Sequence, residues 1–592
     1  MTTDGIWKPV GPPGAADRWV GHDPSDRFSV YTRGNAGEVY PEVFTPLSFS
    51  VAADAAELAM RSAMLSTGLI RPEELSPIPV TTAVGSGVFG GYAYLNLSIQ
   101  RLAAARTPGG KATDADVNYL GVGEEPPPYV PDPHERNRRA TVAGVRYLWR
   151  LLRTTQIPFL ADDQRRVDAY LASLPSPATA TDGELRRSVD AVIDLFAGLF
   201  EHHLIVSVGA GTAVAVLSGI CERQLGDPLL ASRLLSGLGD VDSAAPSAAM
   251  WVLSRQAQAA APVAAVFDAG AQDLAARLRA AATEHPEAAA FWADFETFLA
   301  RFGSRGPNEW DTAFDTWETD PNLALVLIDR LRAADDSHDP ARQGERLSAE
   351  AKALESDCLG RLKPPVRGLF RMALRSARLH SRSRERSKTT VVRAIHGARL
   401  QAMELDRRLV ERSGGQKGDL WFLVDSEVDA YLADPGAHRD LIAERRAQHR
   451  RLAERIPPFF VAGRQPPLEE WEPRSRELPP LPAGETLTGL PGCPGRATGR
   501  ARVVTNPADP RGLAPGDVLV APLTDPSWTP LFVAAEAVVV DVGAVMSHAV
   551  IVSRELGIPC VVSATDATLR IPDGALIEVD GTAGTVTVLA ER

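Results

Sequence analysis

The most informative part of this 592-residue chain is the segment Asp541–Cys560, with the sequence DVGAVMSHAVIVSRELGIPC. The β-branched run Val538–Val540 before it predicts a buried strand. Ser547 is in the position of a helix N-cap, and Gly557 is typical of a helix C-cap. Because Cys560–Val562 again predicts a strand, the expected local order is strand, turn, helix, strand.

His548 lies on the first turn of this predicted helix, at the carboxyl edge of the predicted sheet. The free N–H groups and the positive end of a helix favour an anion there, and a phosphate above all. Imidazole titrates near neutral pH and is a competent nucleophile, so His548 could carry a phosphoryl group. An ordinary surface histidine is the alternative, and position alone does not separate the two.

The pattern G-x-x-x-S-H-x-x-I-V-x-R-E-x-G-I-P closely resembles the phosphohistidine loop of the phosphoenolpyruvate-utilising enzymes, the family that includes pyruvate phosphate dikinase and rifampin phosphotransferase. Family members usually carry two glycines before the Ser-His, where this chain has Gly543 and Ala544. The resemblance implies that His548 is phosphorylated at one site and that its small domain carries the group to a second. It also implies that Gly543 and Ser547 support the phosphate-bearing loop.

The resemblance extends through the tail and predicts an α+β multidomain fold. The similar segments are GRATGRARVV (495–504), GDVLV (516–520), TDPSWTPLF (524–532) and Asp580–Gly581. We therefore expect residues 484–592 to form a small β/β/α swivelling phosphohistidine domain. Residues 469–483 are rich in proline and charge, which is typical of a linker, and the resemblance implies that they act as the hinge.

Residues 1–468 are expected to form a large, mostly helical domain that binds the acceptor substrate. Amphipathic stretches predict its long helices at 135–153, 160–173, 183–222, 247–302, 345–412 and 437–455. The resemblance to the substrate domain of rifampin phosphotransferase rests on the segments at 32–47, 91–98 and 303–310.

Composition excludes several classes of function. The net charge of −12 argues against a general nucleic-acid binder. The four cysteines are scattered, so they indicate neither a disulfide framework nor a thiolate metal site, and no other metal-ligand motif is present. The start Met1–Gly5 has no features of a signal peptide, and charged or small residues interrupt every long apolar patch. We therefore expect a cytoplasmic protein with no metal and no membrane segment.

Residues 361–412 are strongly basic, with fifteen Lys and Arg against four acidic residues. A helical spacing places Arg371, Arg375, Arg378 and Arg382 on one face. A solvated helix face and a wall that faces phosphate are both compatible with this pattern, because guanidinium groups match phosphoryl oxygens bidentately.

Within the basic stretch, Arg384, Glu385 and Lys388 form an R-E-x-x-K pattern. The two cations could neutralise the charge that develops during phosphoryl transfer, and the carboxylate could orient or deprotonate an acceptor hydroxyl. Surface helices often contain this pattern. The region is similar, however, to the domain of rifampin phosphotransferase whose R-E-x-x-K helix receives the phosphohistidine, which implies a catalytic role for all three residues.

Four further residues in the similar segments are candidates for the substrate pocket. They are Glu38, Arg305, Asn308 and Glu309. Ordinary turn chemistry is the alternative for each, because these segments are rich in Gly, Asn and Pro.

The predicted function is that of one subunit of a dikinase-like phosphotransferase. The substrate-domain resemblance begins within the first ~30 residues, and no G-x-x-x-x-G-K-[ST] phosphate cradle is present. We therefore expect a separate ATP-grasp partner that binds ATP and Mg²⁺, with no cofactor held tightly by this chain. His548 would pass the phosphoryl group to a hydroxyl of a small molecule. The alternatives are a non-catalytic binding or scaffold protein, and phosphorylation that drives an elimination or condensation in a biosynthetic pathway.

Overall fold

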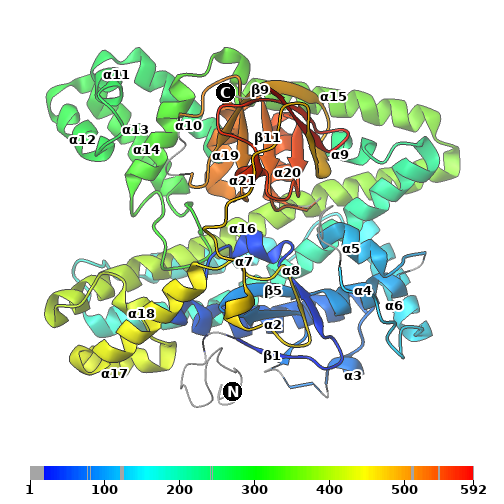
Figure 1. Cartoon of the computed structure of the whole chain (residues 1–592), viewed down its shortest axis with the longest axis horizontal. Helices are drawn as coiled ribbons and strands as arrows, with labels where there is room; N and C mark the ends of the chain where they lie inside the picture. The colour runs from blue at the N-terminus through cyan, green and yellow to red at the C-terminus, as the bar shows by residue number, and fades with distance from the viewer. Residues whose placement is uncertain are drawn as a thin grey trace.

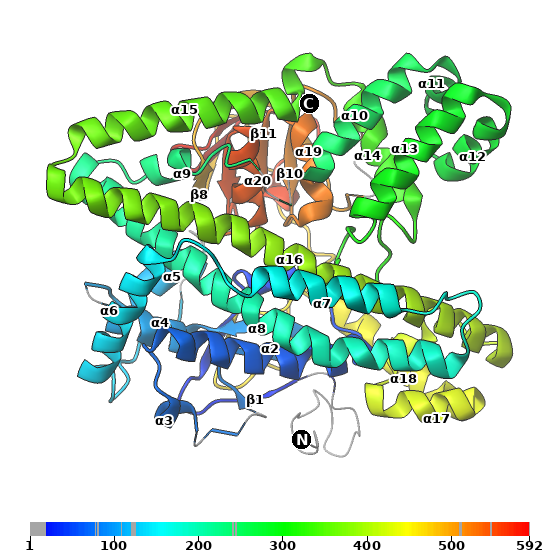
Figure 2. The same ribbon diagram turned by 180° about the vertical axis from the view of Figure 1, so that it is seen from behind.

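The computed structural model describes residues 19, 21–76, 78–79, 82–107, 109–119, 126–239, 242, 245–507, 512–544 and 547–590, with only the backbone at 117–119. The prediction about a signal peptide concerns Met1–Gly5, which lie outside these residues, as do Val545 and Met546. The chain is an α+β multidomain protein, as predicted. Figures 1 and 2 show two bodies, one above the other, with long helices crossing between them.

The lower body in Figure 1 contains a four-stranded antiparallel sheet. Its strand order is β4 (Ser86–Phe89), β5 (Tyr92–Asn96), β2 (Val30–Thr32) and β6 (Phe460–Ala462). The amphipathic pattern does not predict this sheet, because its strands are short and β6 comes from a distant part of the chain. Two further short strands, β1 (Asp23–Pro24) and β3 (Thr82–Ala83), pair in parallel.

Long helices pack with this sheet and with one another. They are α2 (Pro46–Thr67), α7 (Leu160–Ser173), α8 (Asp182–Ile220) and α16 (Pro364–Ser413). A buried aromatic and aliphatic core joins α2, α8 and α16 to the sheet. Shorter helices complete the body: α1 (Ala36–Val39), α3 (Pro72–Leu75), α4 (Leu97–Arg106), α5 (Thr113–Tyr119), α6 (Arg138–Arg153), α17 (Val428–Ala433) and α18 (Arg439–Ala453).

Two of the predicted long helices are divided by proline. The stretch 247–302 forms α10 (Ala245–Ala259), α11 (Ala261–Asp268), α12 (Leu274–Glu284) and α13 (Pro286–Phe302). The stretch 345–412 forms α15 (Pro340–Arg361) and α16. Pro286 and Pro364 occupy first helical positions, where the missing N–H costs no hydrogen bond, so each begins a new helix.

Helix α8 matches the prediction at 183–222 and is unusually apolar. Among the described residues, the run Asp182–Leu225 is long and apolar enough to cross a membrane by length and composition alone, which differs from the sequence prediction. Its buried side chains, however, contribute to the packing against α16 and α2. The core helix of a soluble protein has this same character.

The C-terminal body is built on an eight-stranded mixed sheet. Its order is β7 (Thr486–Thr488), β14 (Thr585–Ala590), β13 (Leu576–Asp580), β9 (Arg496–Val503), β10 (Asp517–Ala521), β11 (Ala537–Val540), β12 (Cys560–Val562) and β8 (Leu490–Cys493). The neighbours β9 to β12 are parallel, and the flanking strands are antiparallel. One face carries α21 (Ala567–Arg570) with a small aliphatic core. The other carries α19 (Thr529–Ala534) and α20 (His548–Leu556).

The structure adds a division that the sequence did not indicate. Helices α10 to α13, with α14 (Pro321–Arg332), share one hydrophobic core with the C-terminal sheet. Both α10 and α14 contact α19 directly. Residues 245–332 therefore pack with the C-terminal body, beside it in Figures 1 and 2, although they lie in the middle of the chain.

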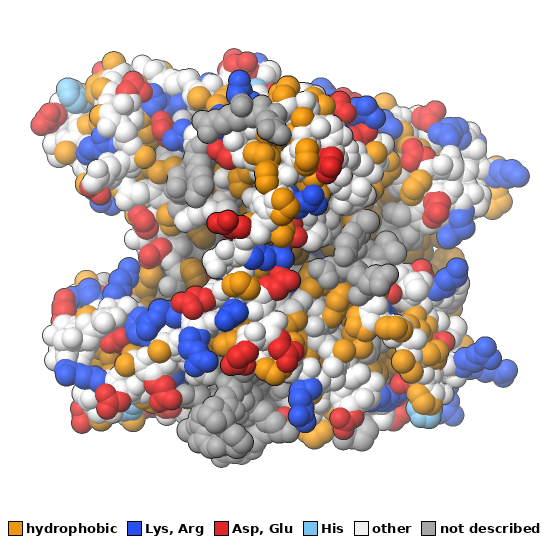
Figure 3. Space-filling model, viewed as in Figure 1, with side chains coloured by type: hydrophobic (Ala, Val, Ile, Leu, Met, Phe, Trp, Pro, Cys, Tyr) orange, Lys and Arg blue, Asp and Glu red, His pale blue; other side chains and the backbone are white. Residues whose placement is uncertain are grey.

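The predicted linker 469–483 connects the two bodies. Near its start, Trp471 is buried in the core of the lower body, and Leu481 near its end is buried in the C-terminal core. Most residues between them are exposed. Figure 3 shows a notch at the left edge between the two bodies, with acidic and basic side chains interspersed over this face.

Candidate functional site

The predicted strand, turn, helix, strand unit is formed by β11, α20 and β12. Ser547 caps α20, because its Oγ accepts a hydrogen bond from the N–H of Val550 at 3.4 Å. Gly557 ends the helix in the left-handed conformation, with φ of 67°. A Cβ on Gly543 would lie 3.0 Å from Cβ of Val562, so close packing restricts the size of the residue at this position.

His548 is the first residue of α20 and lies at the carboxyl end of β11. Its Nδ1 is 3.2 Å from Oγ1 of Thr524, and its Nε2 is 3.1 Å from Oγ1 of Thr529. The ring of Phe532 meets the imidazole edge to face, with centroids 5.9 Å apart. These contacts hold the orientation of the ring, and the tautomer decides which threonine donates and which accepts.

Burial lowers the pKa of His548 well below its ordinary value, and the nearby cations Lys388, Arg305 and Arg384 lower it further. The imidazole is therefore neutral at pH 7. A neutral imidazole keeps a lone pair for nucleophilic attack, and the surrounding positive charge favours an anion bonded to it.

The helix α16 supplies the three residues of the R-E-x-x-K pattern. Lys388 Nζ is 3.3 Å from Oε1 of Glu309, and Arg305 Nη1 donates to the same oxygen at 2.9 Å. Arg399, which is fully buried and lies eleven residues beyond Lys388 on α16, donates to the carbonyl of Glu309 at 2.8 Å and so holds this loop. Arg305, Glu309 and Lys388 thus form one connected group beside His548.

Glu385 lies on a different side of this group. Its Oε1 is 3.4 Å from Nη1 of Arg384. Glu385 also lines a small cavity of about 20 Å³ with Ile551, Arg554 and Glu555, which are three to seven residues beyond His548 on α20. No contact between Glu385 and the imidazole is found among the described residues.

The basic face predicted for the first half of α16, which includes Arg375, Arg378 and Arg382, is not arranged to bind phosphate. Arg375 and Arg382 are exposed and donate to the carbonyls of Leu152 and Leu238. Arg378 pairs with Glu355 at 2.8 Å. This face therefore fits the solvated alternative, and the inward-facing cations of α16 begin at Arg384.

Glu38 joins the lower body to α20 of the C-terminal body. Its Oε2 accepts a hydrogen bond from the backbone N–H of His548 at 3.2 Å. Burial raises the pKa of Glu38 to about 7, although the hydrogen bond from His548 and the charges of Arg384 and Lys388 oppose this rise. The other oxygen, Oε1, is buried and has no hydrogen-bond partner among the described residues.

Asn308 contributes through its backbone. It has a φ of 53°, which favours the turn interpretation, and its N–H donates to Oδ2 of Asp525 at 3.4 Å. Burial raises the pKa of Asp525 to about 6, and the hydroxyl of Ser527 donates to its other oxygen. This contact links the loop at 303–320 to the C-terminal body.

Sequence reasoning missed Thr524, Asp525 and Thr529 as site residues. All three lie in the segment TDPSWTPLF, whose place after a predicted strand was the available signal. Nothing in the local pattern indicates that its two threonines flank a histidine nineteen and twenty-four residues later.

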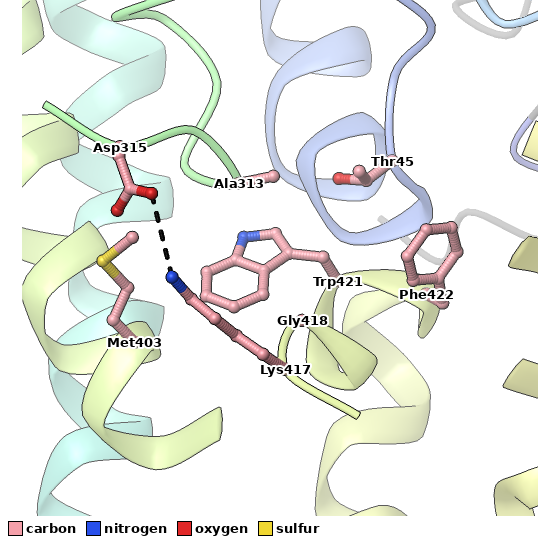
Figure 4. A pocket seen from close by; sticks show the side chains of 8 residues that line it. All are labelled: Thr45, Ala313, Asp315, Met403, Lys417, Gly418, Trp421 and Phe422. Carbon is pink, nitrogen blue, oxygen red and sulfur yellow. Dashed lines mark ion pairs between the residues drawn. The ribbon is translucent and has the colours of Figure 1, made fainter. Parts of the chain in front are cut away.

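A separate cavity lies near the far end of α16. It has a volume of about 190 Å³ and is drawn in Figure 4, with an ion pair of 3.7 Å between Lys417 and Asp315 at its rim. Trp421 and Met403 form part of its wall. Met403 is fifteen residues beyond Lys388 on α16, or ~22 Å at the usual helical rise.

Two family models match the chain. Residues 513–584 match the mobile domain of the PEP-utilising enzymes, and residues 202–385 match the fourth domain of rifampicin phosphotransferase. The resemblance to the phosphoenolpyruvate-utilising enzymes is confirmed. The first match contains His548, and the second ends within the R-E-x-x-K pattern at Glu385.

Three curated relatives describe the extent of the similarity. An uncharacterized protein of Mycobacterium tuberculosis is 38% identical over 315 residues, covering 53% of this chain and 33% of the relative. The rifampicin phosphotransferase of Streptomyces sviceus is 30% identical over 306 residues, covering 50% and 34%. The prodigiosin synthesizing transferase PigC of Serratia marcescens is 26% identical over 610 residues, covering 97% and 64%. The chain thus spans between one third and two thirds of the length of these relatives.

Proposed function

We propose that this chain is a phosphotransferase subunit in which His548 receives a phosphoryl group and passes it to a hydroxyl of a small molecule. The proposal rests most directly on the three cations, Arg384, Lys388 and Arg305, that act on the imidazole of His548. A phosphoryl group on the imidazole would place its negative oxygens in this positive field. Such preorganised charge stabilises the transition state of phosphoryl transfer, which has little covalent chemistry for the protein to perform.

The arrangement of the two bodies corresponds to the step in which phospho-His548 would pass its phosphoryl group to the acceptor. The lower body, through Glu38, and the phosphohistidine body, through His548, are in direct contact. The acceptor would be bound by residues of the lower body beside this contact. During transfer, the P–N bond breaks as the acceptor oxygen bonds to phosphorus, and the electron pair of the P–N bond remains on the imidazole nitrogen.

The proposed donor is a separate ATP-grasp protein that binds ATP and Mg²⁺, so this chain needs no tightly bound cofactor of its own. To reach such a donor, His548 must leave α16. Most of residues 472–480 in the linker are exposed, and nine extended residues span roughly 30 Å, which supports this motion.

A second candidate function follows from the similarity to PigC. PigC is named a synthesizing transferase, and its similarity extends over 97% of the chain. Phosphorylation by His548 would then activate a hydroxyl for condensation or elimination, with release of inorganic phosphate. A binding or scaffold protein is less well supported, because it has no use for a neutral histidine held among three cations.

The proposed function is tested by phosphorylation of the purified chain. With ATP, Mg²⁺ and an ATP-grasp partner, we expect one acid-labile, base-stable phosphoryl group on His548, measured by intact mass and peptide mapping. The chain alone with ATP should show no nucleotide turnover. A label on another residue, or no label with a partner proven active on ATP, would contradict the mechanism. Detection of a phosphorylated acceptor would indicate simple transfer, whereas release of inorganic phosphate would indicate condensation.

Substitution of a threonine that holds the imidazole should have a smaller effect on the rate of phosphorylation of His548. Thr529→Val keeps the side-chain shape and removes the hydroxyl that lies 3.1 Å from Nε2 of His548. A neutral hydrogen bond contributes about 0.5–1.5 kcal/mol, so we expect phosphorylation of His548 to slow by about threefold to tenfold. Rapid-quench measurement of phosphohistidine formation checks this. Thr568→Val, in the same body, removes a hydroxyl that donates to Asp541 instead of contacting His548, so it serves as the matched control and should leave the rate unchanged.

A further inference from the structure

Glu38 is a carboxylate in direct contact with the backbone of His548. We infer that Glu38 is the general base that removes the proton from the acceptor hydroxyl during transfer from phospho-His548, an assignment that rests on the proposed function. The carboxylate is contributed by α1 of the lower body and contacts the first residue of α20. Glu38 therefore reaches the phosphohistidine from the side where the acceptor would bind.

The two oxygens of Glu38 have different environments. Oε2 is occupied by the N–H of His548 at 3.2 Å, which fixes the carboxylate beside the phosphohistidine loop. Oε1 is buried and has no hydrogen-bond partner among the described residues. A buried carboxylate oxygen without a partner is costly unless a ligand satisfies it, and a hydroxyl donor is a suitable ligand.

The charges around Glu38 suit a base that works near neutral pH. It faces Arg384 and Lys388 on α16, and the backbone N–H groups of Ala544 and His548 also act on it. Burial outweighs these groups and raises the pKa of Glu38 to about 7. A general base is most effective when its pKa lies near the operating pH, because it is then both ionised and basic.

The other carboxylates near His548 are less suited to this role. Oε1 of Glu309 is already held by two cations, Arg305 at 2.9 Å and Lys388 at 3.3 Å. Asp525 is bonded to Ser527 and to the N–H of Asn308. Glu385, the base indicated by the sequence pattern, pairs with Arg384 and lies beside Arg554 and Glu555 instead of the imidazole.

The step balances without another reactant. The acceptor oxygen forms a bond to phosphorus as the P–N bond breaks, and the hydroxyl proton passes to Oε1 of Glu38. The electron pair of the P–N bond stays on the imidazole nitrogen, which then takes up one proton. Because Glu38 gives up one proton in turn, neutral His548 and ionised Glu38 are both restored.

The test uses chemically loaded protein, so that it does not depend on the ATP-grasp donor. The full chain is phosphorylated on His548 with phosphoramidate, and glycerol is added as a probe alcohol. Glycerol phosphate is measured by mass spectrometry between about pH 5 and 9, with a His548→Asn protein subtracted for labelling of other histidines. We expect the wild-type rate to rise with pH through about 7, where Glu38 loses its proton. Phosphohistidine itself is acid-labile, so its intrinsic breakdown has the opposite pH dependence.

Glu38→Gln keeps an oxygen that can accept the N–H of His548 but cannot take a proton. We expect it to lower transfer by roughly 10²–10⁴ and to remove the rise with pH. Glu38→Asp should retain the rise at a reduced rate, which excludes a purely structural loss. Glu385→Gln and Glu309→Gln are the matched carboxylate controls and should both keep the rise.

Several results would overturn the assignment. One is a Glu38→Gln protein with the wild-type transfer rate and pH profile. Another is loss of the increase of rate with pH in Glu385→Gln or Glu309→Gln instead. The third is a wild-type protein that transfers the phosphoryl group no faster than free phosphohistidine does. The proposed function has a separate criterion. It fails if an active ATP-grasp partner does not label His548, whatever the chemically loaded protein does.

Discussion

Replacement of His548 by asparagine is expected to abolish phosphoryl labelling of this chain. Asparagine preserves a small polar side chain at the start of α20 but offers no nitrogen lone pair for attack on phosphorus. We expect the label to fall to background in a reaction with an ATP-grasp partner, ATP and Mg²⁺. Phosphohistidine detection by intact mass at alkaline pH provides the measurement.

The matched control is His202→Asn. His202 is half-buried in α8, pairs with Asp163 at 2.8 Å and stacks on Phe159, far from the phosphohistidine loop in the chain. This variant should keep full labelling. If the His548→Asn protein remained labelled at the wild-type level, the phosphocarrier role of His548 would have to be abandoned.

The second large effect is expected at the cations of α16. Arg384→Ala and Lys388→Ala should each lower transfer from phospho-His548 by roughly 10²–10³, the scale of a lost electrostatic stabiliser. Both side chains act on the imidazole, and Lys388 also holds Glu309. Phosphorylation of His548 should persist in both variants, because that step takes place at the donor. Single-turnover assays that begin with isolated phosphoprotein and acceptor measure transfer alone.

Arg382→Ala is the matched control for charge on the same helix. Arg382 is two residues from Arg384, but it is exposed and donates to the carbonyl of Leu238. An exposed substitution of this kind usually changes stability by no more than about 0.5 kcal/mol, and transfer should be unaffected. Normal transfer in Arg384→Ala and Lys388→Ala would show that these cations belong to a solvated face.

Glu385→Gln should slow transfer only if Glu385, and not Glu38, removes the proton of the acceptor hydroxyl.

The local features of α20 could be predicted from sequence because they depend on neighbouring residues. Ser547 caps α20 through a hydrogen bond that spans three residues, and Gly557 ends it in the left-handed conformation. The same holds for the amphipathic helices α6, α7 and α18, whose observed bounds lie within a few residues of the predicted stretches. Periodicity failed to show the breaks at Pro286 and Pro364, because the apolar pattern continues across them.

The sequence by itself therefore determined the α+β character, the family resemblance and the candidate residues His548, Arg384 and Lys388. The contact between Glu38 and His548 joins residues 510 positions apart, and β6 joins β2 across a similar distance. The same tertiary packing brings Thr524 and Thr529 to the imidazole and turns Glu385 toward Arg554. Burial and charge–charge energies depend on distances through space, which no local pattern encodes. Only the folded chain could therefore make His548 neutral and raise the pKa of Glu38 to about 7.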